Sequence, residues 1–584
     1  MFSLKKWFLK NKKADFSAIS MKYGINEVIA RLIINRGVSE DKIKEYIDVP
    51  LESMHNPSLM KDMDKLVSIL KDKITQNKRI LVVGDYDVDG IVSTYILVNA
   101  LGKCGALVEY EVPDRIKDGY GINVSIIDEA YKNGFDTILT CDNGISAIEQ
   151  VKHAKELGMT MLITDHHDIL KDENTGDEII PLADAVVNPH QSQCGYPFKY
   201  LCGAGVAYKV IEALTPSYGF TLEDIRSYIQ FVAIATVCDV VDLVDENRII
   251  VKNGLRHLKE TNNIGLRCLF DINGLKDISS YHLGFVVGPC LNASGRLDTA
   301  KKAIKLLSTS NYEEAGVLAE ELKSLNDERK SLTVKGLEEA IEIIEASSLK
   351  DDKVLVVYLP WCHESLAGII AGRIKEKYYK PTIVLTDAEN CVKGSCRSIE
   401  AYNIFEELQK CSDILLKFGG HPMAAGLSLE KENVDNLRKR LNTYTTLTDE
   451  DIIPKVSIDI ALPLGYLNES LINELKIIEP CGKANEKPIF AEKDVMVNRI
   501  RKLGKNQNVL KINITNQYNK TLDAMYFGDV DDFEDYIINK YGSDELDKAY
   551  RGMINDIKLA LIYYPDINEY NGIKTLQINI KEYQ

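Results

Sequence analysis

A regular alternation of strand-like and helix-like segments between residues 61 and 168 most constrains the fold of this chain. The strand-like runs are ILVVGD, VEYEVPD, TILTCDNG and MLITDHHD, and helical segments such as KDMDKLVSILKDKITQNKR and STYILVNALGKCG stand before and between them. Alternating strands and helices predict a parallel sheet covered by helices, and therefore an α/β fold. In such a sheet, ligands bind at the carboxyl ends of the strands.

The first of these strand ends carries three acids. In Arg79–Gly90, RILVVGDYDVDG, the apolar run predicts a buried strand, and it is followed by Asp85, Asp87 and Asp89. Residues i and i+2 of an extended segment point to the same side, so Asp85 and Asp87 can converge on one point. Two neighbouring carboxylates repel each other unless a cation lies between them. Alone, this segment is equally consistent with a solvated acidic turn.

Acids and histidines recur at the ends of three later apolar segments. Asp142 follows TILTC, the tandem histidines of Asp165-His166-His167 follow MLIT, and Asp239 follows FVAIATVC. A single aspartate in such a place is usually a structural cap. Four segments that meet at one edge of one sheet instead predict a metal site. Carboxylate and imidazole donors without thiolate suit Mn²⁺ or Mg²⁺.

Taken in order, GDYDVDG, CDNG, DHH and TVCDVVDL resemble the four motifs of the DHH phosphoesterase superfamily. The ordered set is far more specific than the DHH triplet alone. The resemblance implies a centre of two divalent metal ions, with ligands from Asp85, Asp87, Asp142, His166 and Asp239.

The resemblance also implies separate roles around these ligands. Asp142 would bridge the two ions, and His167 would face the scissile phosphate. Asp89 and Asp165 would hold their loops by hydrogen bonding. Some members of the superfamily add a histidine just before the first motif. Here Leu81 and Val83 occupy that neighbourhood, so one metal ion is expected to be held more weakly or with more water.

Two downstream segments add candidate anion-binding groups. KYLCGAGVAYKVIEAL (199–214) predicts a glycine-containing turn into a helix, where backbone N–H groups can meet an anion. Close packing at the helix start explains its glycines equally well. GPCLNASGRLDTAKKAIKLL (288–307) is similar to the superfamily's asparagine-to-arginine segment. Its Arg296 can bind a phosphate through two hydrogen bonds, with weaker contacts from Asn292 and Ser294.

A long helix is expected after this first domain. From Tyr312 to about Ser348 the chain has no proline and keeps helical periodicity, which predicts a helix on the order of 50 Å long. It resembles the helix that joins the two catalytic lobes in this superfamily. A coiled-coil arm for dimerisation is the alternative.

A second α/β domain opens with strand, helix and strand over residues 353–386. VKGSCRS and FGGHPMAAG, further along, resemble the DHHA1 domain that closes over the substrate. The resemblance implies that Arg397 and Ser398 bind the nucleic-acid backbone and that His421, preceded by Gly420, binds the phosphate near the cut. Cys396 stands where the superfamily often has glycine, which leaves the close backbone approach at this loop open.

The last part of the chain, from about residue 451, has strands and tight turns and resembles the OB-fold of the superfamily's single-stranded-DNA exonucleases. Such barrels bind single strands by charge and base stacking. Its clearest basic patch consists of Arg499, Arg501, Lys502, Lys505 and Lys511. Tyr526 and Phe527 are candidate stacking groups, and the acidic segment 529–549 is expected to face away from DNA.

We therefore expect an N-terminal helical segment (1–55), a DHH catalytic domain (56–310), a connecting long helix (311–349), a DHHA1 domain (350–450) and an OB-fold nucleic-acid-binding domain (451–584). The net charge of −16 argues mildly against a nucleic-acid partner, because phosphate binding usually leaves a basic footprint. Clustered metal-binding acids explain a few of these charges. The twelve cysteines form no CxxC pair, and we see neither a signal peptide nor a membrane-spanning run. We therefore expect reduced thiols in a cytoplasmic protein.

As a whole, the resemblance implies a metal-dependent exonuclease that hydrolyses single-stranded DNA 5′-to-3′ and releases mononucleotides in DNA repair and recombination. It implies single-strand-binding protein and a helicase as partners, and we expect a monomer. One alternative is another DHH enzyme, an oligoribonuclease, cyclic-dinucleotide phosphodiesterase or pyrophosphatase. The other is a non-catalytic single-strand-binding scaffold. The OB-fold favours a polymer substrate, and the intact motif acids and His166 favour catalysis.

Overall fold

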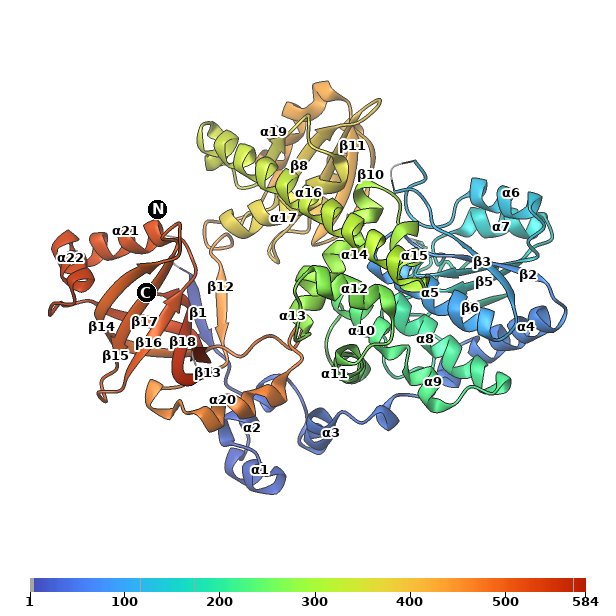
Figure 1. Ribbon diagram of the computed structural model, residues 1–584. Coiled ribbons are helices and arrows are strands. Elements are labelled where there is room, and N and C mark those ends of the chain that lie inside the picture. Colours follow the sequence, from blue (N-terminus) through green and yellow to red (C-terminus); the bar gives the residue numbers. More distant parts are fainter. Residues whose placement is uncertain (1–4, 116, 173, 571) are drawn as a thin grey trace. The chain divides into compact units, whose positions relative to one another are not determined.

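The computed structural model describes residues 5–115, 117–172, 174–570 and 572–584. The chain forms two compact units (Figure 1). One consists of Val49–Thr445 and Pro480–Asn485, and the other of Met1–Asp48, Thr446–Glu479 and Glu486–Gln584. Among the residues described, every helix is too short or too polar to cross a lipid bilayer.

The larger unit begins with the predicted parallel sheet. Its five strands lie in the order β3-β2-β4-β5-β6 and all pair in parallel. Their bounds are β2 Arg79–Val83, β3 Leu107–Glu111, β4 Thr137–Cys141, β5 Thr160–Thr164 and β6 Ala185–Val187. The α/β prediction is confirmed, and every strand that we expected from residues 79–168 is present.

Helices cover both faces of this sheet, as the alternation of side chains along β2 requires. Ile80 and Val82 belong to a core cluster built mainly from helices, whereas Leu81 and Val83 belong to a second cluster on the other face. The first cluster includes α4 (Met63–Thr75), α5 (Val88–Lys103), α8 (Gly203–Leu214) and α10 (Ile229–Cys238); the second includes α6 (Val124–Lys132) and α7 (Ile148–Glu156). The apolar run before Asp239 is thus the helix α10.

Further helices complete this domain and lead to the second one. They are α11 (Asp245–Lys259), α12 (Ile264–Ile272), α14 (Gly288–Leu297) and α15 (Lys301–Ser308). The predicted long helix is α16 (Tyr312–Glu345), which packs against α12, α14 and α15 and, further along, against α17 (Glu364–Tyr378). It therefore joins the two domains of the larger unit (Figure 1).

The second domain is a mixed sheet in the order β10-β11-β9-β8-β7. Its strands are β7 Leu355–Tyr358, β8 Thr382–Asp387, β9 Val392–Arg397, β10 Leu415–His421 and β11 Ala424–Leu429. Only β7 and β8 pair in parallel among these described strands. Besides α17, this domain carries α18 (Ile404–Gln409) and α19 (Val434–Tyr444).

The other unit contains the predicted barrel. Strands β14 (Phe490–Leu503), β15 (Val509–Thr515), β16 (Thr521–Tyr526), β18 (Ile573–Tyr583) and β17 (Lys558–Tyr570) pair in this order, and β17 returns to β14 to close the sheet. Helices α20 (Glu469–Leu475), α21 (Val530–Tyr541) and α22 (Ser543–Arg551) are additions to it. The first residues of the chain share this unit, because β1 (Lys6–Leu9) pairs with β12 (Lys455–Ile458).

Candidate metal centre

The turn after β2 presents its acids because two glycines allow the backbone to fold tightly. A Cβ atom on Gly90 would lie 2.3 Å from the carbonyl oxygen of Asp85, and one on Gly84 would lie 1.9 Å from Oγ1 of Thr94. Asp87 is the N-cap of α5, and its Oδ1 accepts the backbone N–H of Asp89 at 2.9 Å. The DxDxDG segment is therefore a compact strand-to-helix turn whose acids are fixed by the backbone.

Asp142 occupies the corresponding position after β4. It is 2% exposed and has a positive φ of 60°, a conformation that costs free energy and that often marks functional sites. Asn143 links the ends of β2 and β4, because its Nδ2 donates to the carbonyls of Val83 and Cys141. Gly203 packs against the same aspartate, because a Cβ there would lie 2.6 Å from Cβ of Asp142.

The tandem histidines after β5 point in different directions. Nε2 of His166 lies 3.1 Å from Oδ1 of Asp142, and burial lowers the pKa of His166, which favours the neutral imidazole that binds metals. His167 is more exposed, and its Nδ1 lies 2.8 Å from Asp165. Burial alone would lower the pKa of His167, but the bond to Asp165 raises it to about 9. The contact with Asp165 therefore favours the protonated form of His167.

Asp165 and Asp89 each bind backbone N–H groups. Asp165 accepts from Ile145, His166 and His167. Asp89 accepts from Gly203 at 2.6 Å and from Ala204 at 2.8 Å, at the start of α8. The start of α8 therefore binds the Asp89 carboxylate of the same chain as its anion. Oδ2 of Asp89 also lies 3.5 Å from His166.

Asp239 reaches the same place from the end of α10, where it is the C-cap residue. Its Oδ2 lies 3.8 Å from Nε2 of His166. The five predicted ligands therefore converge, although they come from four distant segments. Three overlapping groups have donor atoms within 4.8 Å of one another: Asp85-Asp87-Asp142, Asp142-His166-His167 and Asp89-His166-Asp239.

The electrostatics of this cluster favour bound cations. Burial and the Asp87 carboxylate raise the pKa of Asp85 to about 8, and burial with Asp89 raises that of Asp239 to about 9. Burial and the neighbouring acids also raise the pKa of Asp142. Oδ1 of Asp85 is buried without a hydrogen-bond partner among the described residues. Divalent cations would satisfy this oxygen and remove the repulsion.

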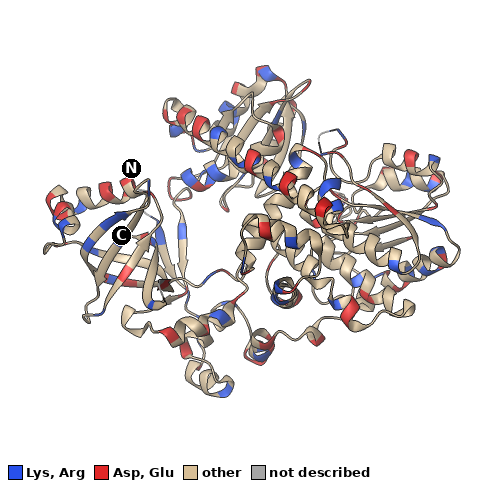
Figure 2. Cartoon of the chain, viewed as in Figure 1, with Lys and Arg blue, Asp and Glu red and all other residues tan. Residues whose placement is uncertain are grey.

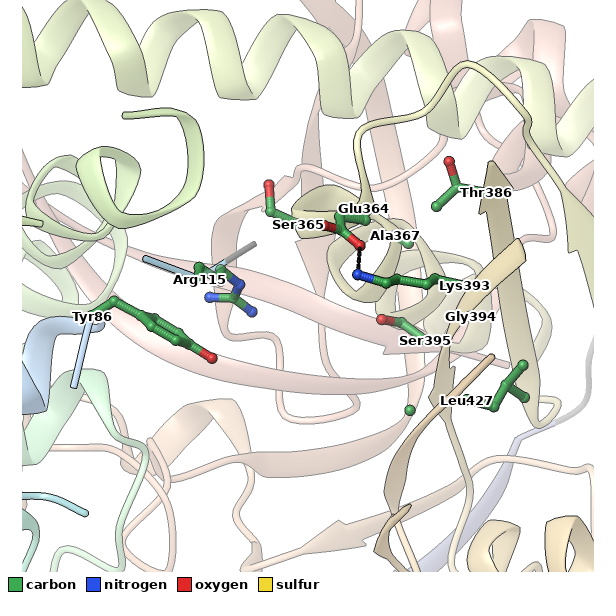
Figure 3. A pocket seen from close by; sticks show the side chains of 11 residues that line it. Tyr86, Arg115, Glu364, Ser365, Ala367, Thr386, Lys393, Gly394, Ser395 and Leu427 are labelled. Carbon is green, nitrogen blue, oxygen red and sulfur yellow. Dashed lines mark ion pairs between the residues drawn. The ribbon is translucent and has the colours of Figure 1, made fainter. Parts of the chain in front are cut away.

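A cavity of about 240 Å³ lies between the two domains of the larger unit (Figure 3). Tyr86 and Arg115 lie on one side of it, and Glu364, Lys393 and Ser395 lie on the other. The Arg115 guanidinium is 4.8 Å from the centre of the Tyr86 ring, and Lys393 pairs with Glu364 at 2.7 Å. The cavity therefore offers two cations and is lined by Tyr86, which stands between Asp85 and Asp87 of the first motif.

Arg296 lies close to this cavity and lacks an ion-pair partner among the described residues. Its Nη1 donates to the carbonyl of Ser365 at 2.6 Å. Burial, together with Arg115 and Arg329, lowers the pKa of Arg296 to about 10. A phosphate bound to Arg296 would offset the repulsion that this guanidinium experiences from Arg115 and Arg329.

Two serines proposed as substrate contacts are inside the protein. Ser294 is fully buried and donates to the carbonyl of Leu291; Ser398 is 1% exposed and donates to the carbonyl of Tyr402. Both hydroxyls are thus buried and already donate to backbone carbonyls, so we no longer propose them as substrate contacts. Asn292 differs from them, because its Oδ1 is buried without a hydrogen-bond partner among the described residues.

The remaining candidates of the second domain lie on β9 and on the β10–β11 hairpin. Cys396 points into the core and is fully buried, whereas Ser395 and Arg397, its neighbours on β9, are half-buried. Cys396 therefore does not obstruct the face of β9 on which Ser395 and Arg397 lie. His421 is exposed at the hairpin turn, and Gly420 before it has a φ of 146°. Any Cβ at Gly420 would lie 2.5 Å from the carbonyl oxygen of Ala424.

The basic residues of the barrel belong to the other unit. Arg499, Arg501 and Lys505 are exposed, whereas Lys502 pairs with Glu534 at 2.8 Å and Lys511 pairs with Asp523 at 2.8 Å. Figure 2 shows cations on β14 and acids on α21 and α22. Of the two proposed stacking groups, Phe527 is 64% exposed, but Tyr526 is a core residue that contacts Phe533 and Tyr583. Only Phe527 can stack on a base.

Four residues of the site were missed by the sequence analysis: Tyr86, Arg115, Tyr120 and Lys393. The hydroxyl of Tyr120 donates to the carbonyl of Asp142 and lies 3.1 Å from Nδ1 of His167, so it fixes this histidine. Arg115 and Tyr120 follow β3, whose carboxyl end lies at the same edge as those of β2 and β4. Their place just after a strand of the parallel sheet was a sequence signal that could have identified these two residues. No comparable sequence signal marks Lys393.

Comparison with known proteins agrees with this architecture. Three family models match the chain: DHH family, N-terminal domain, over residues 79–236; DHHA1 domain, over 351–446; and RecJ OB domain, over 458–582. The single-stranded-DNA-specific exonuclease RecJ of Bacillus subtilis is 35% identical over 99% of this chain and 70% of its own length. The protein of the same name from Haemophilus influenzae is 32% identical, over 91% and 92%.

Solved structures give the same result. RecJ from Thermus thermophilus, in complex with Mn²⁺, superimposes with a TM-score of 0.83 at 25% identity and covers 100% of this chain and 80% of that one. An exonuclease RecJ bound to manganese has a TM-score of 0.60 at 30% identity, over 70% of this chain and 99% of that one. With motifs, fold and acidic cluster all in agreement, the chain belongs to the RecJ family.

Proposed function

We propose that this protein is an exonuclease that hydrolyses phosphodiester bonds of single-stranded DNA with the help of two divalent cations. The observation that carries the proposal is the convergence of Asp85, Asp87, Asp142, His166 and Asp239 in overlapping groups. Relatives that share the whole architecture are named single-stranded-DNA-specific exonucleases.

The donor set fits Mn²⁺ or Mg²⁺. It consists of carboxylate oxygens and imidazole without thiolate, and one buried oxygen, Oδ1 of Asp85, lacks a partner among the described residues. Asp142 belongs to two of the three groups, which supports a bridging role. Both oxygens of Asp89 already accept backbone N–H groups, which supports a positioning role. Two bound cations would activate a water molecule and stabilise negative charge on the attacked phosphate.

The chain's own cations act on the phosphate. His167 is fixed by Asp165 and Tyr120, and its contact with Asp165 favours the protonated ring that would donate to the phosphate. Arg296 can donate to a non-bridging oxygen, where negative charge grows during attack. His421 and Arg397 are the candidate contacts from the second domain, and Asn292 stays a candidate because of its unsatisfied buried oxygen.

The cavity between the domains supports a single strand as substrate. At about 240 Å³ it is smaller than most sites for drug-sized ligands, which suits a strand end better than a duplex. Arg115 and Lys393 line it together with Tyr86, the residue between Asp85 and Asp87 in the chain. We propose that it receives the phosphate at the 5′ end of the strand. Binding this end would give the 5′-to-3′ direction that the family suggests. Arg499, Arg501, Lys502 and Lys505 of the barrel would hold the strand further along.

The proposal is tested with single-stranded DNA labelled at its 5′ or 3′ end and incubated with Mn²⁺ or Mg²⁺. We expect prompt release of labelled mononucleotide from the 5′ label and late release from the 3′ label. Asp142→Ala should reduce cleavage by more than the ~10–100-fold typical of changes around a metal's ligands, while DNA binding persists. Asp128→Ala, at an exposed residue on α6, is the control. Absence of release with either metal would refute the activity.

The cellular setting is also a proposal. Family membership supports a role in DNA repair and recombination, in the cytoplasm, with single-strand-binding protein and a helicase as partners. We expect a monomer, which sedimentation analysis can check.

A further inference from the structure

Two neighbouring aromatic side chains stand in solvent on the larger unit. Tyr281 is 63% exposed and Phe285 is 67% exposed. Their ring centres lie 4.9 Å apart with an angle of 25° between the planes, so the rings are stacked. They lie on α13 (Ser280–His282) and on the π-helical turn that continues it (Leu283–Val287). Such π-helical turns occur frequently at functional sites.

The π-helical turn is anchored directly beside the candidate metal centre. Sγ of Cys238, the last residue of α10, donates to the carbonyl of Leu283 at 3.5 Å. A Cβ on Gly288 would lie 2.2 Å from the same sulfur, so the two segments touch closely. Asp239, a proposed metal ligand, is the next residue after Cys238. The aromatic pair therefore projects from a rigid support that adjoins the reaction centre.

We propose that Tyr281 and Phe285 form a stacking platform for bases of single-stranded DNA that is held at the metal centre. This inference rests on the proposed function. Stacking on an aromatic ring is worth about 1–3 kcal/mol per base and tolerates any sequence, since every base has a flat face. A platform at this place would hold nucleotides near the cut and complement the phosphate contacts of the interdomain cavity.

A protein partner is a poorer match for this surface. An aromatic side chain buries at most ~150–250 Å², so the two rings fall short of the ~800 Å² per partner of a standard interface. Val240, which is 60% exposed and follows Asp239, adds little to this area. The size of the patch therefore suits one or two bases.

The test compares the wild-type protein with the double variant Tyr281→Ala/Phe285→Ala. Two oligothymidylates of about 20 nucleotides, more than one OB-fold covers, serve as probes, one with all bases and one with abasic sites near the 5′ end. We expect the variant to bind the strand with all bases ~10-fold more weakly, with a higher KM and a similar kcat. The loss should be much smaller for the abasic strand.

Controls separate stacking from other effects. Tyr281→Phe/Phe285→Tyr keeps both rings and should restore binding, whereas Tyr131→Ala removes a ring that is 52% exposed on α6 and should change nothing. Equal binding by the variant and the wild-type protein, with normal cleavage by the latter, would overturn the platform and leave the proposed function intact. An equal loss on both strands would also overturn it. Failure of the wild-type protein to cleave either strand would instead refute the proposed function.

Discussion

Asp142 shows how single residues fix the geometry of the centre. Its backbone adopts a positive φ of 60°, and Gly203 packs so closely against it that any side chain at position 203 would clash with the Asp142 Cβ. The free energy of this strained conformation is offset by the surrounding hydrogen bonds, among them the one from the Tyr120 hydroxyl to the Asp142 carbonyl.

Gly203→Ala should therefore weaken metal binding although it replaces none of the proposed ligands. The new methyl group would lie 2.6 Å from Cβ of Asp142 and would displace this aspartate. We expect Mn²⁺ affinity, measured by calorimetric titration, to fall by ~10–100-fold, as for other changes around metal ligands. Gly102→Ala in α5 is the matched control, because its nearest neighbour is 3.9 Å away. Equal affinities for the two variants would contradict the close packing.

Asp136, which precedes β4, should give a pH-dependent contribution to stability. Burial alone would raise its pKa, but hydrogen bonds from Lys73 and Thr137 outweigh burial and hold the pKa below the ordinary value of 3.8. A lowered pKa stabilises the fold above the unfolded-state pKa, and this stability is lost as pH falls through the folded-state pKa. Asp136→Asn should cost about 0.5–1 kcal/mol at neutral pH. Urea unfolding should show the difference shrinking below about pH 4; a constant difference would exclude a charge effect.

At the scale of elements, α16 contains two glycines in very different surroundings. Gly316 has no atom within 4 Å of the position that a Cβ would take, whereas at Gly336 the Cβ would lie 2.5 Å from Cδ1 of Ile370. Ile370 is fully buried in the core of the second domain. The first glycine is therefore a weak point of the helix, and the second is a packing contact between α16 and α17.

We expect different results from the same substitution at these two glycines. Gly316→Ala should stabilise the protein by about 0.5–1 kcal/mol, because alanine loses less backbone entropy on folding. Gly336→Ala should give no such gain, since the Ile370 side chain must move within a packed core. Urea unfolding followed by circular dichroism measures both. Equal stabilisation of the two variants would show that the contact at Gly336 is loose.

At the scale of the whole molecule, the net charge of −16 is compatible with a DNA-binding protein, because the charges are segregated. Acids gather in the metal cluster and on α21 and α22, whereas exposed cations lie on β14 (Figure 2). Cations also line the interdomain cavity. A negative net charge therefore coexists with basic surfaces that can bind phosphates.

The division into two compact units predicts two thermal unfolding transitions. Mn²⁺ should raise the transition temperature of the larger unit only, because this unit holds the acidic cluster. At a hundredfold excess over Kd, the free energy of unfolding of this unit should increase by about 2.7 kcal/mol. Chelation with EDTA should reverse the shift, and Asp142→Asn should abolish it. Scanning calorimetry measures these effects. A shift of both transitions by Mn²⁺ would contradict a single centre in the larger unit.

The sequence alone determined the α/β fold, the long helix, the barrel and the strand ends that carry Asp85, Asp142 and His166, because these follow from local periodicity and from motifs in contiguous residues. Tertiary structure decided which groups face a ligand. Asp89 binds the start of α8, 114 residues away. Ser294, Ser398 and Tyr526 turned inward, while Arg115 and Lys393 came to face one cavity. Burial and side-chain direction depend on neighbours that are remote in sequence, so local patterns do not show them; only the position of Arg115 after β3 was a sequence signal.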